Sequence, residues 1–103
     1  MTSKQRSYLI KLASSIDPVL EIGKAGITPE VTKAVDEALE ARELIKLHLL
    51  KNCFEDIRQV ADTLAERTRS QVVQVIGKKL VLYRETKTPG KNKILLPQTK
   101  SKE

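Results

Sequence analysis

Two glycines separated by two residues form the segment best suited to holding a ligand. Gly23-Lys24-Ala25-Gly26 lies between a short apolar run and a helix start in which Thr28 can act as the cap. Glycines let the main chain turn tightly, so that bare amide groups can approach an anionic oxygen while Lys24 adds a point charge. Such contacts position a phosphodiester without reading its base. A tight turn with no ligand needs the same glycines, so the pattern alone leaves both interpretations open.

Other nucleotide-binding chemistry fits this loop less well. It lacks the Gly-Lys-Ser/Thr ending of an NTPase phosphate loop and the third glycine of a dinucleotide fingerprint. The loop of KH domains, which clamps backbone nucleotides, has the same two-residue spacing between its glycines. Aromatic residues make up only 3% of the chain, so we expect no paired platform for stacking bases. We place Tyr8 and Phe54 in the core, whereas Tyr83 fits either the core or the surface.

Catalytic and metal-binding patterns do not stand out. The carboxylates form no recognisable catalytic pair, and no nucleophile is accompanied by a base and an orienting group. Cys53 is the single cysteine, which excludes an internal disulfide and a multi-cysteine metal site, and we assign it a structural role. His48 alternates onto the same strand face as Lys46 and adds to a polar surface. We therefore expect no enzyme activity, no metal, no cofactor and no small-molecule substrate.

The charge is strongly basic and unevenly distributed. The net charge is +6 and the pI is about 9.6, which favours a polyanionic partner, either nucleic acid or an acidic membrane surface. The segment 28–41 carries four acidic residues and one lysine, so the remainder of the chain holds a net +9. A nucleic acid would be drawn to that remainder, although lysines that only maintain solubility would give the same total.

No run approaches the roughly 20 apolar residues that span a bilayer, and the N-terminus lacks the apolar segment of a signal peptide. We therefore expect a cytoplasmic protein that does not enter a membrane.

Periodicity predicts seven elements. Helices are expected at 3–14, 28–41 and 55–68, and strands at 19–22, 43–50, 71–76 and 80–84. Gly77-Lys78-Lys79 reads as a hairpin connection between the last two strands. This αβαβαββ order indicates a layered α/β domain in which helices pack on a four-stranded mixed sheet.

The domain is predicted to cover residues 1–85. Residues 86–103 are rich in lysine and polar residues and are predicted to form a mobile basic tail, in which Ile94-Leu95-Leu96 is a docking segment.

Three motifs resemble the YhbY family, the stand-alone bacterial form of the CRM (chloroplast RNA splicing and ribosome maturation) domain. They are Ile22-Gly23-Lys24-Ala25-Gly26-Ile27-Thr28, Ala41-Arg42-Glu43-Leu44-Ile45-Lys46-Leu47 and Val75-Ile76-Gly77-Lys78-Lys79-Leu80-Val81-Leu82-Tyr83-Arg84. The resemblance spans about residues 3 to 85. It implies a fold similar to the C-terminal domain of the third bacterial initiation factor and a KH-like glycine loop that contacts RNA.

The resemblance also implies association with precursors of the large ribosomal subunit, since bacterial members bind these particles whereas plant relatives support intron splicing. We expect a monomer that binds large-subunit rRNA and assists ribosome assembly. The alternative is a protein-interaction adaptor that uses the acidic helix and residues 94–96, and DNA binding ranks third. From the loop, the charge and the shared motifs, the predicted RNA-binding residues are Gly23, Lys24, Ala25, Gly26, Thr28, Lys4, Arg6, Lys11, Lys46, Lys78, Lys79 and Arg84.

Overall fold

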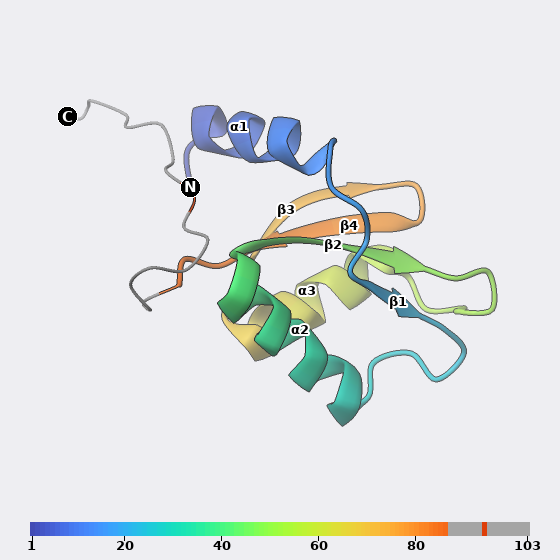
Figure 1. The fold of residues 1–103 in the computed structure, drawn as a ribbon. Coiled ribbons are helices and arrows are strands. Elements are labelled where there is room, and N and C mark those ends of the chain that lie inside the picture. The colour runs from blue at the N-terminus through green and yellow to red at the C-terminus, as the bar shows by residue number, and fades with distance from the viewer. Residues whose placement is uncertain (87–93, 95–103) are drawn as a thin grey trace.

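The computed structural model describes residues 1–86 and 94. Its elements are, in chain order, α1 (Ser3–Ala13), β1 (Leu20–Ile22), α2 (Pro29–Arg42), β2 (Leu44–Leu49), α3 (Ile57–Thr68), β3 (Gln71–Ile76) and β4 (Lys79–Tyr83). The predicted order of elements is confirmed. Figure 1 shows α2 and α3 against one face of the sheet and α1 against the other.

Side-chain caps fix where each helix begins. The Thr28 hydroxyl accepts the Val31 amide at 3.1 Å, and Pro29 takes the first helical position of α2, where its missing N–H costs nothing. The Asp56 carboxylate accepts the Gln59 amide at 3.1 Å. Helix α3 therefore begins at Ile57, two residues later than predicted, because Asp56 is its cap.

The sheet is mixed, with strand order β1-β2-β4-β3. Strands β1 and β2 are parallel and are joined by the crossover helix α2, whereas β4 pairs antiparallel with both β2 and β3. The β3–β4 turn contains only Gly77 and Lys78, since Lys79 already belongs to β4. Gly77 has a φ of +59°, a conformation that two-residue hairpin turns require and that glycine adopts without strain.

Each face of the sheet has its own apolar cluster. Alternation along β2 sends Ile45, Leu47 and Leu49 towards α2 and α3, where they join the larger core. Leu44 faces the other way and joins a smaller cluster with Leu9 and Ala13 of α1. Ile10 and Leu12 of α1 pack against this cluster as well.

Two of the three aromatic residues were predicted wrongly. Phe54 is 89% exposed and Tyr8 is 37% exposed, although both were assigned to the core. Phe54 follows the buried Cys53 in the segment that leads to the α3 cap, so Cys53 takes the buried position instead. On α1 the adjacent Leu9 points at the sheet, which leaves Tyr8 on its flank. Tyr83, whose position was left open, is buried at 5% exposure.

Two described residues beyond β4, Thr86 and Ile94, pack on the domain. Thr86 is buried and its amide donates to the carboxylate of Glu43 at 2.6 Å, so this residue belongs with the folded domain rather than with the predicted tail. The amide of Ile94 donates to the second oxygen of the same carboxylate. The Ile94 side chain packs against the α1 cluster. The remainder of the predicted tail, with Leu95 and Leu96, lies outside the described residues.

Candidate nucleic-acid interface

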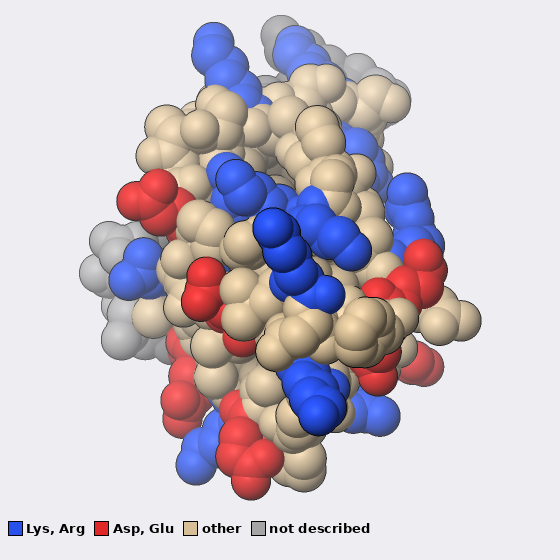
Figure 2. Space-filling view, turned by 90° about the vertical axis from the view of Figure 1, so that its right-hand side faces the viewer, with Lys and Arg blue, Asp and Glu red and all other residues tan. Residues whose placement is uncertain are grey.

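Three connecting segments meet at one end of the sheet. The Leu50 amide donates to the Ile22 carbonyl at 2.9 Å, which joins the end of β1 to the segment after β2. The Leu49 amide donates to the Lys78 carbonyl at 2.7 Å, which joins β2 to the β3–β4 turn. Lys24, Lys51 and Lys78 therefore project from neighbouring turns, and all three are exposed. Figure 2 views this end, with Lys and Arg side chains gathered across its middle and most acidic side chains to the sides and below.

The glycine segment is a hydrogen-bonded turn. The Gly26 amide donates to the Gly23 carbonyl at 3.0 Å, so Lys24 and Ala25 occupy the two central positions and are both exposed. Within the part of the chain that the structure describes, the amides of Lys24 and Ala25 donate no hydrogen bond. Amides that have no acceptor at the tip of an exposed turn can donate to an anion.

The two glycines have different structural needs. Gly26 is buried with a φ of +67°, and a Cβ at this position would lie 2.8 to 2.9 Å from the carboxyl group of Glu55. A Cβ on Gly23 would lie 3.4 Å from Asn52 Oδ1, which is an ordinary contact. The glycines therefore shape the turn, while Lys24 and Ala25 form its accessible surface. Thr28 likewise serves structure, because its hydroxyl caps α2.

Two more lysines extend the basic surface onto the sheet. Lys79 lies opposite His48 in the β2–β4 pairing, and Lys46 lies two residues from His48, so all three share the α1 face. The end of α1 and this part of the sheet border a recess of about 310 Å³ lined by both lysines. His48 Nδ1 lies 3.6 Å from a carboxylate oxygen of Glu21. We call the Gly23–Gly26 turn and Lys46, Lys51, Lys78 and Lys79 the lysine end.

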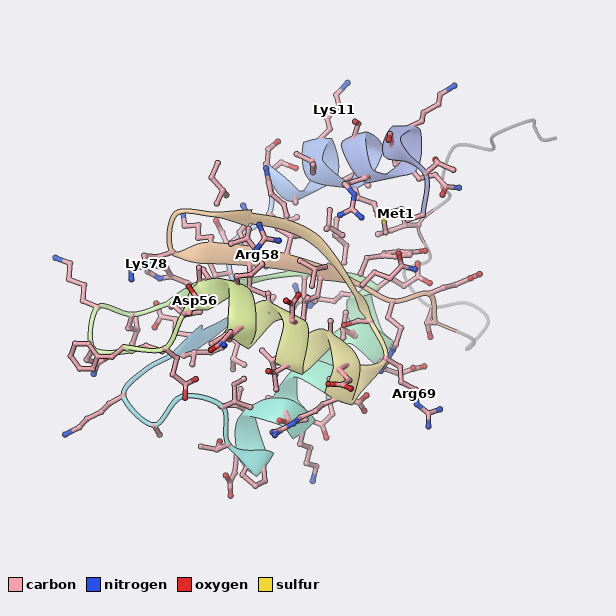
Figure 3. All side chains as sticks on the ribbon, turned by 180° about the vertical axis from the view of Figure 1, so that it is seen from behind. Met1, Lys11, Asp56, Arg58, Arg69 and Lys78 are labelled. Atoms are coloured by element: carbon pink, nitrogen blue, oxygen red, sulfur yellow. The ribbon has the colours of Figure 1, made fainter. Side chains whose placement is uncertain are left out.

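The lysines of the lysine end have no carboxylate partner among the described residues. Across residues 1–86 and 94, ion pairs join only His48 to Glu21 and Arg84 to Asp36 and Glu40. The lysine ammonium groups thus keep their charge available to a partner. Figure 3 shows Lys78 and Asp56 at this end and Arg69 at the far end of the molecule.

Arg84 does not join the other predicted residues. Its guanidinium donates to the Asp36 carboxylate at 2.6 Å, to the Thr68 carbonyl at 2.8 Å and to the Asp36 carbonyl at 3.0 Å. It lies beyond the opposite end of β4 from Lys79. Arg84 therefore fastens α2 and α3 to the sheet. We leave it out of the lysine end.

The predicted residues of α1 have mixed roles. The Arg6 guanidinium donates to the Val72 carbonyl at 2.7 Å and the Val73 carbonyl at 2.9 Å, which fastens α1 to β3. Lys4 and Lys11 are exposed, and Figure 3 shows Lys11 pointing away from the sheet. Helix α1 therefore lies beside the lysine end, and we do not include its basic residues in that surface.

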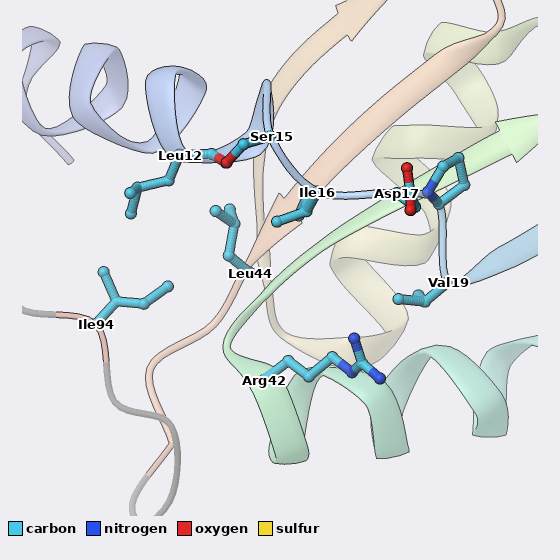
Figure 4. Close-up of a pocket in the computed structure, with 9 residues that line it drawn as sticks. Leu12, Ser15, Ile16, Asp17, Val19, Arg42, Leu44 and Ile94 are labelled. Atoms are coloured by element: carbon cyan, nitrogen blue, oxygen red, sulfur yellow. The ribbon is translucent and has the colours of Figure 1, made fainter.

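Other features of the described residues offer little chemistry. The recess in Figure 4, about 680 Å³, is lined mainly by apolar residues, including Leu12, Ile16, Leu44 and Ile94. It lies where α1, α2 and the C-terminal segment meet. Within residues 1–86 and 94, no three His, Cys, Asp or Glu side chains are grouped to hold a metal ion. No helix in the same residues has the length and apolar character needed to cross a membrane.

Sequence reasoning missed Lys51 and the position of Phe54. Lys51 falls between the strand predicted at 43–50 and the helix predicted at 55–68, and only the parallel pairing of β1 with β2 brings it beside the glycine turn. The signal that could have found it was the βαβ order, since the C-terminal ends of parallel neighbours share one edge of the sheet. No pattern in the sequence indicated that Phe54 faces solvent.

The fold and this end define the class: a small mixed α/β domain with a glycine turn and exposed lysines at one sheet edge. The chain belongs to the CRS1/YhbY (CRM) domain family, whose model matches residues 1–84. It is 46% identical to the protein named "Probable RNA-binding protein YqeI" from Bacillus subtilis over 87 residues, which cover 84% of this chain and 91% of that one. A "Probable RNA-binding protein" from Methanocaldococcus jannaschii is 34% identical, with 99% of this chain and 75% of that one covered.

The same fold occurs in a solved relative. The solution structure of the hypothetical protein SAV1595 from Staphylococcus aureus is similar with a TM-score of 0.77 and 52% sequence identity. The match covers 94% of this chain and 99% of that one. This similarity agrees with the three helices and four-stranded mixed sheet described above.

Proposed function

We propose that this protein binds RNA by holding its phosphate backbone at the lysine end. The observation that carries the proposal is the meeting of three turns, which brings Lys24, Lys51 and Lys78 together beside the exposed amides of the glycine turn. Two relatives named as RNA-binding proteins support the same partner. Backbone contacts position an RNA without specifying its sequence, so selection follows the shape of the strand across the turns and the sheet face.

We further propose that the RNA belongs to precursors of the large ribosomal subunit in the cytoplasm. The support is the family resemblance of the glycine loop and the two later motifs. The adaptor alternative is weakened by one observation: Ile94, part of the predicted docking segment, packs against α1 of its own chain. A side chain that already packs on its own chain is less available to a partner protein.

Lys24→Ala tests the grip on the backbone. For single-stranded RNA, each phosphate that the protein no longer neutralises reduces the slope of log affinity against log salt by about 0.7. We expect Lys24→Ala both to weaken binding to a labelled single-stranded RNA and to reduce this slope. The matched control is Lys33→Ala, because Lys33 is also exposed but lies on the acidic helix α2. Unchanged binding and slope in a folded Lys24→Ala protein would remove the glycine turn from the interface.

Crosslinking in cells tests the choice of RNA. We expect sequences recovered from wild-type protein to be dominated by large-subunit rRNA, and those from Lys24→Ala to be depleted of it. A library dominated by messenger RNA, with the same Lys24 dependence, would keep the mode of binding and reject the ribosomal assignment. Survival of particle association after nuclease treatment would instead favour the adaptor.

A further inference from the structure

The most exposed large apolar side chain of the described residues lies beside the glycine turn. Phe54 is 89% exposed, compared with 61% for Ile76 and 39% for Met1. A single exposed apolar residue needs no explanation by itself. Phe54, however, follows Lys51 and Asn52, and Asn52 faces Gly23 across the two segments. An aromatic ring is therefore presented next to the atoms proposed to hold phosphate.

The exposure of Phe54 is imposed by its neighbours in the chain. Cys53 is buried at 2% exposure, and its amide donates to the Leu50 carbonyl at 3.0 Å. Two residues after Phe54, Asp56 is fixed as the cap of α3. The backbone on both sides of the ring is thus held in place, which lowers the entropy lost when a ligand packs on it.

A recess adjoins the ring and differs in charge from the lysine end. It has a volume of about 460 Å³ and is lined by Phe54, Glu55, Asp56, Gln59 and Arg67, with Ile27 from the segment after the glycine turn. Its two carboxylates, with Arg67 as the one cation beside them, make the recess less suited to a phosphate than the lysine end is. They suit a nucleobase, whose amino groups donate hydrogen bonds to carboxylates and whose flat face stacks on an aromatic ring.

We propose that Phe54 is a base-stacking residue and that the adjoining recess receives one nucleobase of a single-stranded RNA whose backbone lies on the glycine turn. This inference rests on the proposed function and adds a base-contacting site to it. Stacking tolerates any base because each has a flat π face. The recess next to the ring adds a preference for bases that carry an amino group.

The experiment compares Phe54 variants in binding to a fluorescein-labelled oligoadenylate. Loss of one stacked base costs about 5- to 150-fold in affinity, and we expect this loss for both Phe54→Ala and Phe54→Leu. Phe54→Tyr should retain the affinity, because it retains the ring. The salt slope should stay at its wild-type value in all of these variants, in contrast to Lys24→Ala, since the phosphate contacts are unchanged.

A second probe separates stacking from an effect on the shape of the loop. Phe54→Trp introduces the sole tryptophan of the chain, and we expect its fluorescence to be quenched by oligoadenylate but not by an abasic oligonucleotide of equal length. Equal weakening of abasic and adenine-bearing probes by Phe54→Ala would overturn the proposal. If Phe54→Leu binds with wild-type affinity while Lys24→Ala binds weakly, the base-stacking site alone is overturned. If both variants bind with wild-type affinity, the proposed function is rejected as well.

Discussion

The two ends of the sheet use charge in opposite ways. At the lysine end, exposed ammonium groups from separate turns lie together without a described carboxylate partner. At the other end, Arg84, Asp36, Glu40, Glu43 and Thr86 are bonded to one another or to neighbouring backbone; we call these residues the carboxylate end. Cations whose bonds are satisfied inside the protein stabilise the fold, and cations that remain solvated are left for a partner.

The contrast matters because both ends lie in segments that resemble the family motifs. The last motif begins near Lys78 at the lysine end and finishes at Arg84 at the carboxylate end. Strand β4 thus connects a surface suited to ligand binding with a cluster that fastens helices. A charged residue in a shared motif is therefore not by itself evidence of an RNA contact.

The largest expected effect on stability comes from Arg84→Ala. The side chain is only 19% exposed, and its loss removes charge-assisted hydrogen bonds to Asp36 and to the Thr68 carbonyl. We expect the free energy of unfolding to fall by about 2 kcal/mol. Urea denaturation measures this change. The matched control is Arg58→Ala on the exposed side of α3, which should change stability by less than about 0.5 kcal/mol.

The same variant breaks or supports the comparison between the two ends. RNA affinity per folded molecule and the salt slope should be unchanged in Arg84→Ala, because its guanidinium is committed to the protein. A salt slope that falls by about 0.7 would mean that Arg84 leaves its carboxylates to hold a phosphate. The division between a structural and a binding end would then be wrong.

A smaller effect on stability is expected within the glycine turn. Gly26→Ala forces a side chain into the left-handed region and against Glu55, which should cost about 1 kcal/mol or somewhat more. Gly23→Ala should stay within about 0.5 kcal/mol of wild type, since its Cβ makes only ordinary contacts. Thermal and urea unfolding of the pair measure the difference. Equal losses would show that Gly23 also needs the conformational freedom of glycine.

The sequence predicted the helices and strands more accurately than the contacts between them. Periodicity and caps identify α2 and the strands because these signals lie within a few residues of one another. The pairing of Arg84 with Asp36 spans 48 positions, and the placing of Lys51 beside the glycine turn depends on strand order. Both are set by tertiary packing, which periodicity does not encode.

The error at Phe54 has the same origin. An apolar residue just before a helix fits a core position equally well from sequence alone. Whether Cys53 or Phe54 takes the buried position depends on the backbone conformation of the segment after β2. The candidate site was therefore predictable in its glycine turn, Lys46, Lys78 and Lys79, but not in Lys51 or Phe54.

The smallest expected effect is a dependence of stability on alkaline pH at the carboxylate end. Burial raises the pKa of Tyr83 above 10.0, and the nearby charges of Glu43 and Glu85 raise it further. The unfolded chain loses this proton first, so the stability contributed by the neutral phenol is complete below about pH 10 and is lost as pH rises through the folded pKa. Over that interval the free energy of unfolding should fall more steeply than in Tyr83→Phe, by at most about 1.4 kcal/mol per pH unit.

Urea denaturation between about pH 9 and 11 measures the two slopes, and Tyr8→Phe on the surface of α1 is the matched control. Identical slopes in wild type and Tyr83→Phe would show that neither burial nor the nearby carboxylates raise the pKa of Tyr83.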